Sequence, residues 1–451
     1  MDIRRAQGAL LQDNRLVQEH VCAYTRRDRR AKIRGGARGA QEMLMHRDQV
    51  FVAGGQPTVT YVDRQELHVE RSLARALATP NQIVSLAGPT KTGKTVLCKK
   101  MLGEREYVWI DGGQIKSADE LWSKITAELN IPYERAASSE VSTQVEGGVS
   151  VSVVSAGGSR LSSQTRENLH RVDGMAEALL AMQERHIILV IDDFHYIDPE
   201  SRKEIVRNLK GAIFNGLKVM LLSVAHRVFD AISAESELTG RFISVTLPEW
   251  IPGELKQIAT LGFQELRVDC PSEIVDRIVA EAQSSPFLMQ KFCWEICFDN
   301  DVEKPPLFSR TKIPSDYDLK SMFTRIAQDA GLPIYQKLVA GPQARKERLK
   351  RPLKSGDQAD IYEATLLAIA ETGPLASISY DDLRSKLSTL LTEMMPQKHE
   401  ITSALKHLAN ISLKGGLSSA VDWDEERREV SVADPYLRFF LRWQVRGTAP
   451  M

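Results

Sequence analysis

One short stretch constrains the fold of this chain more than any other, because it combines glycines, a lysine and hydroxyl residues at fixed spacing after an apolar run. The apolar run covers residues 83–87, and an amphipathic segment follows the stretch. The stretch itself consists of Gly88, Pro89, Thr90, Lys91, Thr92, Gly93, Lys94 and Thr95. This succession of strand, glycine loop and helix is the one that a phosphate-binding loop requires. The sequence therefore predicts an α/β fold that binds a nucleoside triphosphate.

The chemistry of phosphate binding explains why these residue types stand at this spacing. Backbone N–H groups around Gly88 and Gly93 must point at the β-phosphate, where a Cβ atom would obstruct them. The positive end of the helix that starts near Lys94 adds to the attraction. The pattern places the Lys94 ammonium on the β- and γ-phosphates and the Thr95 hydroxyl on Mg²⁺. We therefore expect the whole stretch 88–95 to bind the cofactor and Thr95 to be a metal ligand.

A second motif supplies the acidic partner that such a loop needs. Residues 186–191 form a continuous apolar run, as expected for a strand buried on both faces of a parallel sheet, and Asp192 and Asp193 end it. We expect Asp192 to hold the metal through water and Asp193 to orient or deprotonate the attacking water. The alternative is a buried strand that merely ends in acidic turn residues, but it leaves the match between the two motifs unexplained.

Composition narrows the class of protein but not its partner. At 451 residues with 43% hydrophobic content, the chain is long enough for about three packed domains. Lysine plus arginine and aspartate plus glutamate both total 59, so net charge predicts neither a nucleic-acid nor an acidic partner. The five cysteines are scattered, and no apolar run approaches the roughly 18 residues of a membrane span. We expect a cytoplasmic protein without a membrane partner.

Composition shifts along the chain predict five parts. They are a basic N-terminal extension at 1–57, a P-loop core at 58–250, a helical lid at 251–300, a charged linker at 301–357 and a winged helix domain at 358–446. The first part fits either a nucleic-acid arm or a weakly ordered extension, and translation could start at Met43 or Met45. Alternating residues between glycine pairs predict a β-hairpin insertion at 141–160, which is either a decorated loop or a contact for a partner.

The last part has the pattern of a winged helix-turn-helix. Apolar periodicity predicts helices near 359–371, 379–391 and 397–411, and two short strands follow at 420–423 and 428–432. Three helices and a β-ribbon are the components of this DNA-binding and protein-binding unit.

With these features in this order, residues 58–446 resemble the AAA+ and STAND branches of the P-loop ATPases. The likeness is greatest to bacterial and archaeal ATPases that carry a C-terminal winged helix, and origin-recognition and transposon-regulator ATPases are more distant. Those ATPases end in a segment that here reads Asp434, Pro435, Tyr436, Leu437, Arg438 and Phe439. The resemblance implies a P-loop NTPase sheet core, ATP as the nucleotide and Mg²⁺ as the metal.

The resemblance also implies roles for residues outside the two motifs. Arg227, after the fourth strand, matches a sensor of the γ-phosphate, and Arg241, before the last strand, matches an arginine finger aimed at a neighbouring subunit, which implies a homo-oligomer. A surface ion pair is the alternative for each arginine. The lid around Pro286 is closer to the Gly-x-Pro element of STAND switches than to an AAA+ sensor. With Asp193 where AAA+ motors usually carry glutamate, this implies a slow ATP hydrolase.

Three functions remain open at this level. One is an ATP-driven switch that self-associates and signals to a protein partner or effector, as STAND-like ATPases of bacterial signalling and antiviral defence do. The second is a DNA-loading or remodelling ATPase, and the third is an adaptor with a structural nucleotide. The supposed recognition helix has two lysines, Lys398 and Lys406, and the wing has the acids Asp422, Asp424, Glu425 and Glu426. This charge favours a protein partner, and the basic residues at 345–354 predict at most weak, non-specific DNA binding.

Overall fold

The computed structural model describes residues 44–64, 67–131, 174–224, 241–343, 347–392, 394–414 and 420–445. The chain divides into two compact bodies, residues 1–45 and residues 46–451, and the elements described below belong to the second body. The basic stretch up to residue 43 and the predicted hairpin at 141–160 lie outside the described residues. Among the described residues, no helix combines the length and the apolar character needed to cross a membrane.

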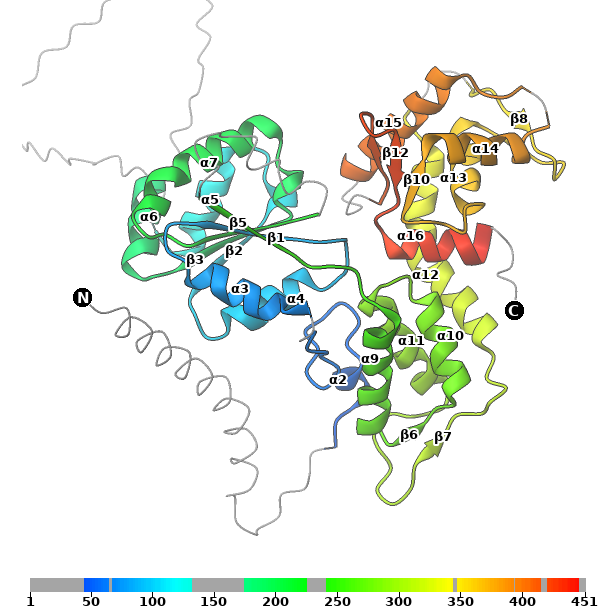
Figure 1. The fold of residues 1–451 in the computed structure, drawn as a ribbon, viewed down its shortest axis with the longest axis horizontal. Helices are drawn as coiled ribbons and strands as arrows, with labels where there is room; N and C mark the ends of the chain where they lie inside the picture. The colour runs from blue at the N-terminus through cyan, green and yellow to red at the C-terminus, as the bar shows by residue number, and fades with distance from the viewer. Residues whose placement is uncertain are drawn as a thin grey trace, which may run out of the picture. The chain divides into compact units, whose positions relative to one another are not determined.

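A five-stranded sheet forms the core of the N-terminal half (Figure 1). Every pair of neighbouring strands is parallel, in the order β2-β3-β4-β1-β5. The strands are β1 Ile83–Ala87, β2 Tyr107–Asp111, β3 Ile188–Asp192, β4 Val219–Ser223 and β5 Phe242–Thr246. The chain runs from β1 out to one edge and returns to the other side of β1, so the strand order reverses there. Ligands of open α/β sheets bind at such a reversal, beyond the carboxyl ends of the strands. The P-loop NTPase α/β core that the sequence predicts is confirmed.

Helices cover both faces of this sheet, which explains why its strands read as continuous apolar runs. One face packs against α3 Val69–Ala78 and α4 Lys94–Leu102, and the other packs against α5 Ala118–Glu128, α6 Gly174–Glu184 and α7 Pro199–Phe214 (Figure 1). Alternate residues of β3 divide between the faces: Leu189 and Ile191 contact the second set of helices, while Ile188 and Val190 contact the first.

Three helices make up most of residues 251–300, the region where the sequence predicts a lid. The helices are α9 Pro252–Glu265, α10 Ser272–Glu281 and α11 Pro286–Asp299, and β6 Val268–Asp269 pairs with β7 Thr311–Lys312 beside them. The short helix α2 Arg47–Val50 precedes a segment that packs on α9. The ring of Phe51 lies so close to Gly262 that a Cβ atom there would be 2.2 Å from it. The segment before the core is therefore joined to the lid.

The stretch expected to be a charged linker contains a 22-residue helix, α12 Leu319–Ala340. Its buried residues Met322, Phe323 and Ile326 recur at helical spacing, a period that the charged residues around it mask in the sequence. The Phe323 ring lies 5.8 Å from the Phe439 ring of α16 Pro435–Phe440. The helix α12 is therefore packed into the fold and does more than connect its neighbours.

The C-terminal unit, residues 347–445, has the three helices and two strands that the sequence predicts for a winged helix. They are α13 Ile361–Ala370, α14 Tyr380–Leu390, α15 Lys398–Lys414, β11 Asp422–Asp424 and β12 Glu429–Ser431. A third strand, β10 Ser377–Ser379, was not predicted, and it completes an antiparallel sheet in the order β10-β12-β11. A two-stranded pair, β8 Arg351–Pro352 with β9 Gln358–Ala359, precedes them, and a last helical turn at Leu441–Val445 follows α16.

Candidate functional site

The phosphate-binding loop lies between β1 and α4. Glycine is required at each of its two glycine positions for a different structural reason. A Cβ atom on Gly88 would lie 2.6 Å from the carbonyl oxygen of Leu247, so only glycine allows the loop to pass this backbone. Gly93 has φ +95° and forms the N-cap of α4, a left-handed conformation that glycine adopts without steric cost. The loop therefore leaves the backbone N–H groups that open α4 at the carboxyl end of β1.

Lys94 is buried at the start of α4, where its ammonium group donates to backbone carbonyl groups. Its Nζ atom donates hydrogen bonds to the carbonyl oxygens of Gly88, at 2.9 Å, and Pro89, at 2.8 Å. Burial lowers the pKa of Lys94 to about 8, while the charges of Asp193 and Asp192 oppose the shift. A phosphate would stabilise the charged form of this lysine, because it supplies the negative charge that neutral carbonyl groups lack.

Thr95 and Asp192 come together across the sheet, as the two motifs require. The Thr95 hydroxyl donates to Oδ2 of Asp192 at 3.0 Å, and Oδ1 of Asp192 accepts the N–H of Asp193 at 3.0 Å. Burial raises the pKa of Asp192, and the hydrogen bond from Thr95 opposes this rise. A hydroxyl and a carboxylate are oxygen ligands of the kind that Mg²⁺ prefers, so these residues fit the implied metal.

Asp193 directly follows β3 and has a left-handed conformation, with φ +51°. The turn that follows β2 approaches this backbone closely, because a Cβ atom on Gly112 would lie 2.7 Å from the carbonyl oxygen of Asp193. Burial, and secondly the charge of Asp192, raises the pKa of Asp193 to about 6. A carboxylate with this raised proton affinity is better suited to accept a proton from water than an ordinary exposed aspartate.

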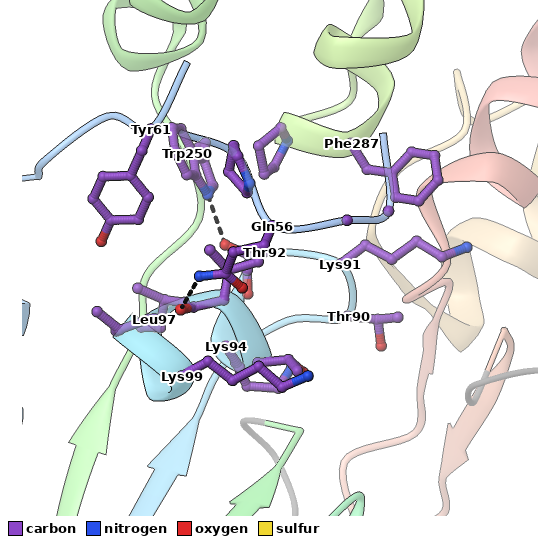
Figure 2. A pocket seen from close by; sticks show the side chains of 18 of the residues that line it. Gln56, Tyr61, Thr90, Lys91, Thr92, Lys94, Leu97, Lys99, Trp250 and Phe287 are labelled. Carbon is purple, nitrogen blue, oxygen red and sulfur yellow. Dashed lines mark hydrogen bonds between the residues drawn. The ribbon is translucent and has the colours of Figure 1, made fainter. Parts of the chain in front are cut away.

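A cavity of about 480 Å³ lies over the loop and extends beyond the phosphate-binding residues. Its walls include residues 52, 54–57 and 60–62 of the segment before the core, as well as Trp250 and, at the start of α11, Pro286 and Phe287 (Figure 2). The indole N–H of Trp250 donates to the carbonyl oxygen of Thr92 at 2.9 Å. The cavity thus offers a largely apolar compartment beside the phosphate loop, of the size needed for a small ligand.

Arg64 fixes the wall that contains Trp250. Its Nε atom donates to Oε1 of Glu254 at 2.8 Å, and its other nitrogens donate to the carbonyl oxygens of Pro248, at 2.9 Å, and Glu249, at 2.6 Å. The guanidinium lies 4.9 Å from the centre of the Trp250 ring. A planar group with several donors can satisfy this many acceptors at once. The network joins the cavity wall to α9 of the lid.

The remaining predicted site residues have different places. Pro286 lines the cavity at the first turn of α11. Arg241 does not line it: its carbonyl oxygen accepts the N–H of Ile83 at the amino end of β1, and its guanidinium lies 5.0 Å from the Phe214 ring. Arg227 lies outside the described residues. The sensor role of Arg227 and the finger role of Arg241 stay predictions.

Sequence reasoning missed Trp250, Arg64 and Phe287. Trp250 follows β5 at a point where the sequence shows only the end of a strand, and Arg64 stands in a polar segment before α3. The proline before Phe287 marks a helix start, but nothing local shows that the ring faces a cavity. A search for aromatic residues shortly after the core strands would have found Trp250 after β5, together with Phe194 and Tyr196 after β3.

No family model matches the chain, and no curated protein matches it. Solved structures do. The chain is similar to the Walker-type ATPase PABY2304 of Pyrococcus abyssi, with 16% identity over 85% of this chain and 96% of that one and a TM-score of 0.47. The ORC2 protein of Aeropyrum pernix is 14% identical over 88% of this chain and 96% of its own, with a TM-score of 0.45. Cdc6p of Pyrobaculum aerophilum is 14% identical over 88% of this chain and 98% of its own, with a TM-score of 0.41.

Removal of the loop lysine should remove nucleotide binding. We expect Lys94→Ala to weaken ATP binding by at least about a hundredfold, because each hydrogen bond to a charged group is worth about 1.5–3 kcal/mol. Isothermal titration calorimetry with Mg-ATP measures this. The control is Lys203→Ala on α7, whose exposed pair with Glu200 lies away from the cavity wall; this variant should change affinity less than about fivefold. Equal affinity of Lys94→Ala and wild type would refute the phosphate-binding role.

Proposed function

We propose that this protein is a switch that binds ATP with Mg²⁺, hydrolyses it slowly, self-associates and signals to a protein partner. The observation that carries the proposal is the hydrogen bond of 3.0 Å between Thr95 and Asp192, beside a glycine loop and a buried lysine. The proposal is supported by the presence of a buried loop lysine, a hydroxyl–carboxylate pair and a second carboxylate, Asp193, in the wall of one cavity.

Each residue of the site would have a separate role in binding or hydrolysis. The loop N–H groups and Lys94 would bind and orient the β- and γ-phosphates, and Thr95 and Asp192 would hold Mg²⁺. When bound, Mg²⁺ neutralises charge on the phosphate oxygens during transfer. Asp193 would orient a water molecule towards the γ-phosphate and accept its proton. An aspartate has a shorter side chain than glutamate, which supports slow turnover. That the base is adenine rests on the family resemblance.

Self-association is supported by the place of Arg241. The hydrogen bond from Ile83 to its carbonyl oxygen puts it at the amino end of β1, whereas the phosphate loop starts at the carboxyl end. Five residues of strand span about 16 Å, so Arg241 lies far from its own loop. An arginine finger in this position can serve only the nucleotide of a neighbouring copy.

A protein partner is supported by the charges of the C-terminal unit. On the candidate recognition helix α15, Lys406 pairs with Glu425 of the wing at 2.8 Å. In the basic stretch at the start of the unit, Arg351 is buried and donates to Glu400 at 2.7 Å, and Arg348 donates to Asp360 at 2.9 Å. These cations are already paired with carboxylates, so fewer remain to neutralise DNA phosphates. A DNA-loading ATPase is the second candidate, and an adaptor with a structural nucleotide is the third.

A substitution of Asp193 should abolish ATP hydrolysis without abolishing ATP binding. We expect Asp193→Asn to bind Mg-ATP with near wild-type affinity and to lose ATP turnover, because the amide keeps the shape but cannot accept the proton. Phosphate release and calorimetric titration measure the two effects. Asp111→Asn is the control, since Asp111 ends the adjacent strand but is exposed. If Asp193→Asn hydrolyses ATP at the wild-type rate, another group is the base.

Turnover should depend on contacts between copies. We expect specific activity to rise with protein concentration and Arg241→Ala to lower it by about 10³-fold or more, the effect of losing an arginine finger. A mixture of Asp193→Asn and Arg241→Ala subunits should recover part of the activity, because the first still donates the finger and the second still holds the working carboxylate. Activity that is flat with concentration, together with an inactive mixture, would make Arg241 a structural residue.

The C-terminal unit should bind DNA weakly and without sequence preference. Because its exposed lysines are few and partly paired, binding should fade as salt rises from about 50 to 200 mM, with a shallow slope. Fluorescence anisotropy of the full chain with duplex DNA measures this, and Lys398→Glu and Lys406→Glu test the recognition helix. A nanomolar, sequence-selective complex that persists at 200 mM salt and is lost in these variants would favour the DNA-loading function.

A further inference from the structure

A residue of the phosphate loop forms an ion pair with the C-terminal unit. The Nζ atom of Lys91 lies 2.6 Å from Oδ2 of Asp434, the residue that precedes α16. Lys91 also lines the nucleotide cavity, and its side chain extends away from Lys94 in the view of Figure 2. One lysine thus connects the nucleotide site to a helix more than three hundred residues away in the sequence.

The Asp434 carboxylate is almost completely buried, with 2% of its side chain exposed. Its Oδ1 atom accepts the N–H groups of Tyr436, at 2.7 Å, and Leu437, at 3.1 Å, and so caps α16. Its Oδ2 atom accepts from Lys91. A buried carboxylate needs this compensation, so loss of the lysine would remove the ion-pair partner of Asp434 and destabilise its contact with the loop.

The backbone of Lys91 has a conformation that is typical of glycine. Its φ is +60°, in the left-handed region where glycine is favoured and a lysine is strained. Strain at such a position persists only where other interactions offset it. For Lys91 the offsetting interactions are the ion pair with Asp434 and the Tyr436 ring, whose centre lies 4.0 Å from the ammonium.

Phe287 of the lid connects the Lys91–Asp434 pair to the cavity wall. The Phe287 ring packs edge-on against Tyr436, with 5.0 Å between the ring centres, and Phe287 lines the cavity. A Cβ atom on Gly54, also in the cavity wall, would lie 2.8 Å from the Phe287 ring. Lid, loop and α16 therefore meet around the Lys91 ammonium.

We propose that the Asp434 carboxylate and the terminal phosphates of the nucleotide compete for the Lys91 ammonium. Nucleotide binding then weakens the attachment of α16 to the loop, and loss of that attachment strengthens nucleotide binding. The proposal rests on the proposed function, since it requires that the cavity binds a nucleoside triphosphate. Its physical basis is that one compact ammonium cannot fully compensate two anionic groups, and that a buried carboxylate beside the loop repels phosphates.

Reciprocity makes the proposal measurable at the nucleotide. Asp434→Asn removes the competing charge but keeps an acceptor that caps helices equally well. We expect this variant to bind ATPγS about tenfold more tightly than wild type, within the usual range of coupling between sites. The matched control is Glu400→Gln, which breaks the pair with buried Arg351 inside the C-terminal unit and leaves the loop untouched. Its affinity should equal that of wild type.

The same coupling should be visible at α16. In the full-length protein, hydrogen exchange of the amides at 434–440 should speed up when ATPγS is added to wild type. In Asp434→Asn it should be fast before nucleotide is added and change little afterwards. Lys91→Gly removes the ammonium and relieves the backbone at φ +60°, so it should also show fast exchange without nucleotide, while Glu400→Gln should behave as wild type.

Each outcome has a defined meaning. If wild type does not bind ATPγS, the proposed function itself is wrong. If wild type binds it, but Asp434→Asn has unchanged affinity and exchange at 434–440 does not respond to nucleotide, the competition is refuted and the ion pair is only structural. Should Asp434→Asn fail to fold, Lys91→Gly decides alone: exchange at 434–440 equal to that of wild type without nucleotide overturns the proposal.

Discussion

The parallel pairing of β3, β4 and β1 is the constraint on which the rest of the site depends. Ala87 of β1 pairs with Ser223 of β4, and Ile191 of β3 pairs with Leu221, so all three strands end at one edge of the sheet. The phosphate loop and Asp192 then meet across the end of β4, where Thr95 donates to Asp192. A slip of one residue in β3 would turn the Asp192 side chain to the opposite face and separate the pair.

Burial gives this edge of the sheet its chemistry. It is the largest cause of the lowered pKa of Lys94, about 8, and of the raised pKa of Asp193, about 6, and it also raises the pKa of Asp192. In each case the protein disfavours the charged form. A bound phosphate anion would stabilise charged Lys94, and a metal cation would stabilise the carboxylates. The same burial that makes these groups reactive therefore makes ligand binding contribute to folding stability.

The parts of the molecule that could be predicted from the sequence are those specified locally. Gly88, Gly93, Lys94 and Thr95 lie within one loop, and Asp192 follows an apolar run whose length and residue types indicate a buried strand. Trp250 could not be placed in the cavity, because the carbonyl group that it contacts belongs to a loop more than 150 residues earlier. Two further elements were missed for other reasons: β10 has three residues, too few for a period, and the charged residues around α12 hide its apolar face.

The attachment of the C-terminal unit to the lid determines how a change at the cavity can reach it. The buried carboxylate of Glu281 accepts hydrogen bonds from Arg442, at 2.8 Å, and Trp443, at 3.0 Å. Arg438 donates to the carbonyl oxygen of Gln283 at 3.1 Å, three residues before Pro286 in the cavity wall. These contacts fix α16 and the last turn to the lid, whereas Lys91 fixes α16 to the loop. Loss of the Lys91 contact alone would therefore leave the attachment of the C-terminal unit to the lid in place.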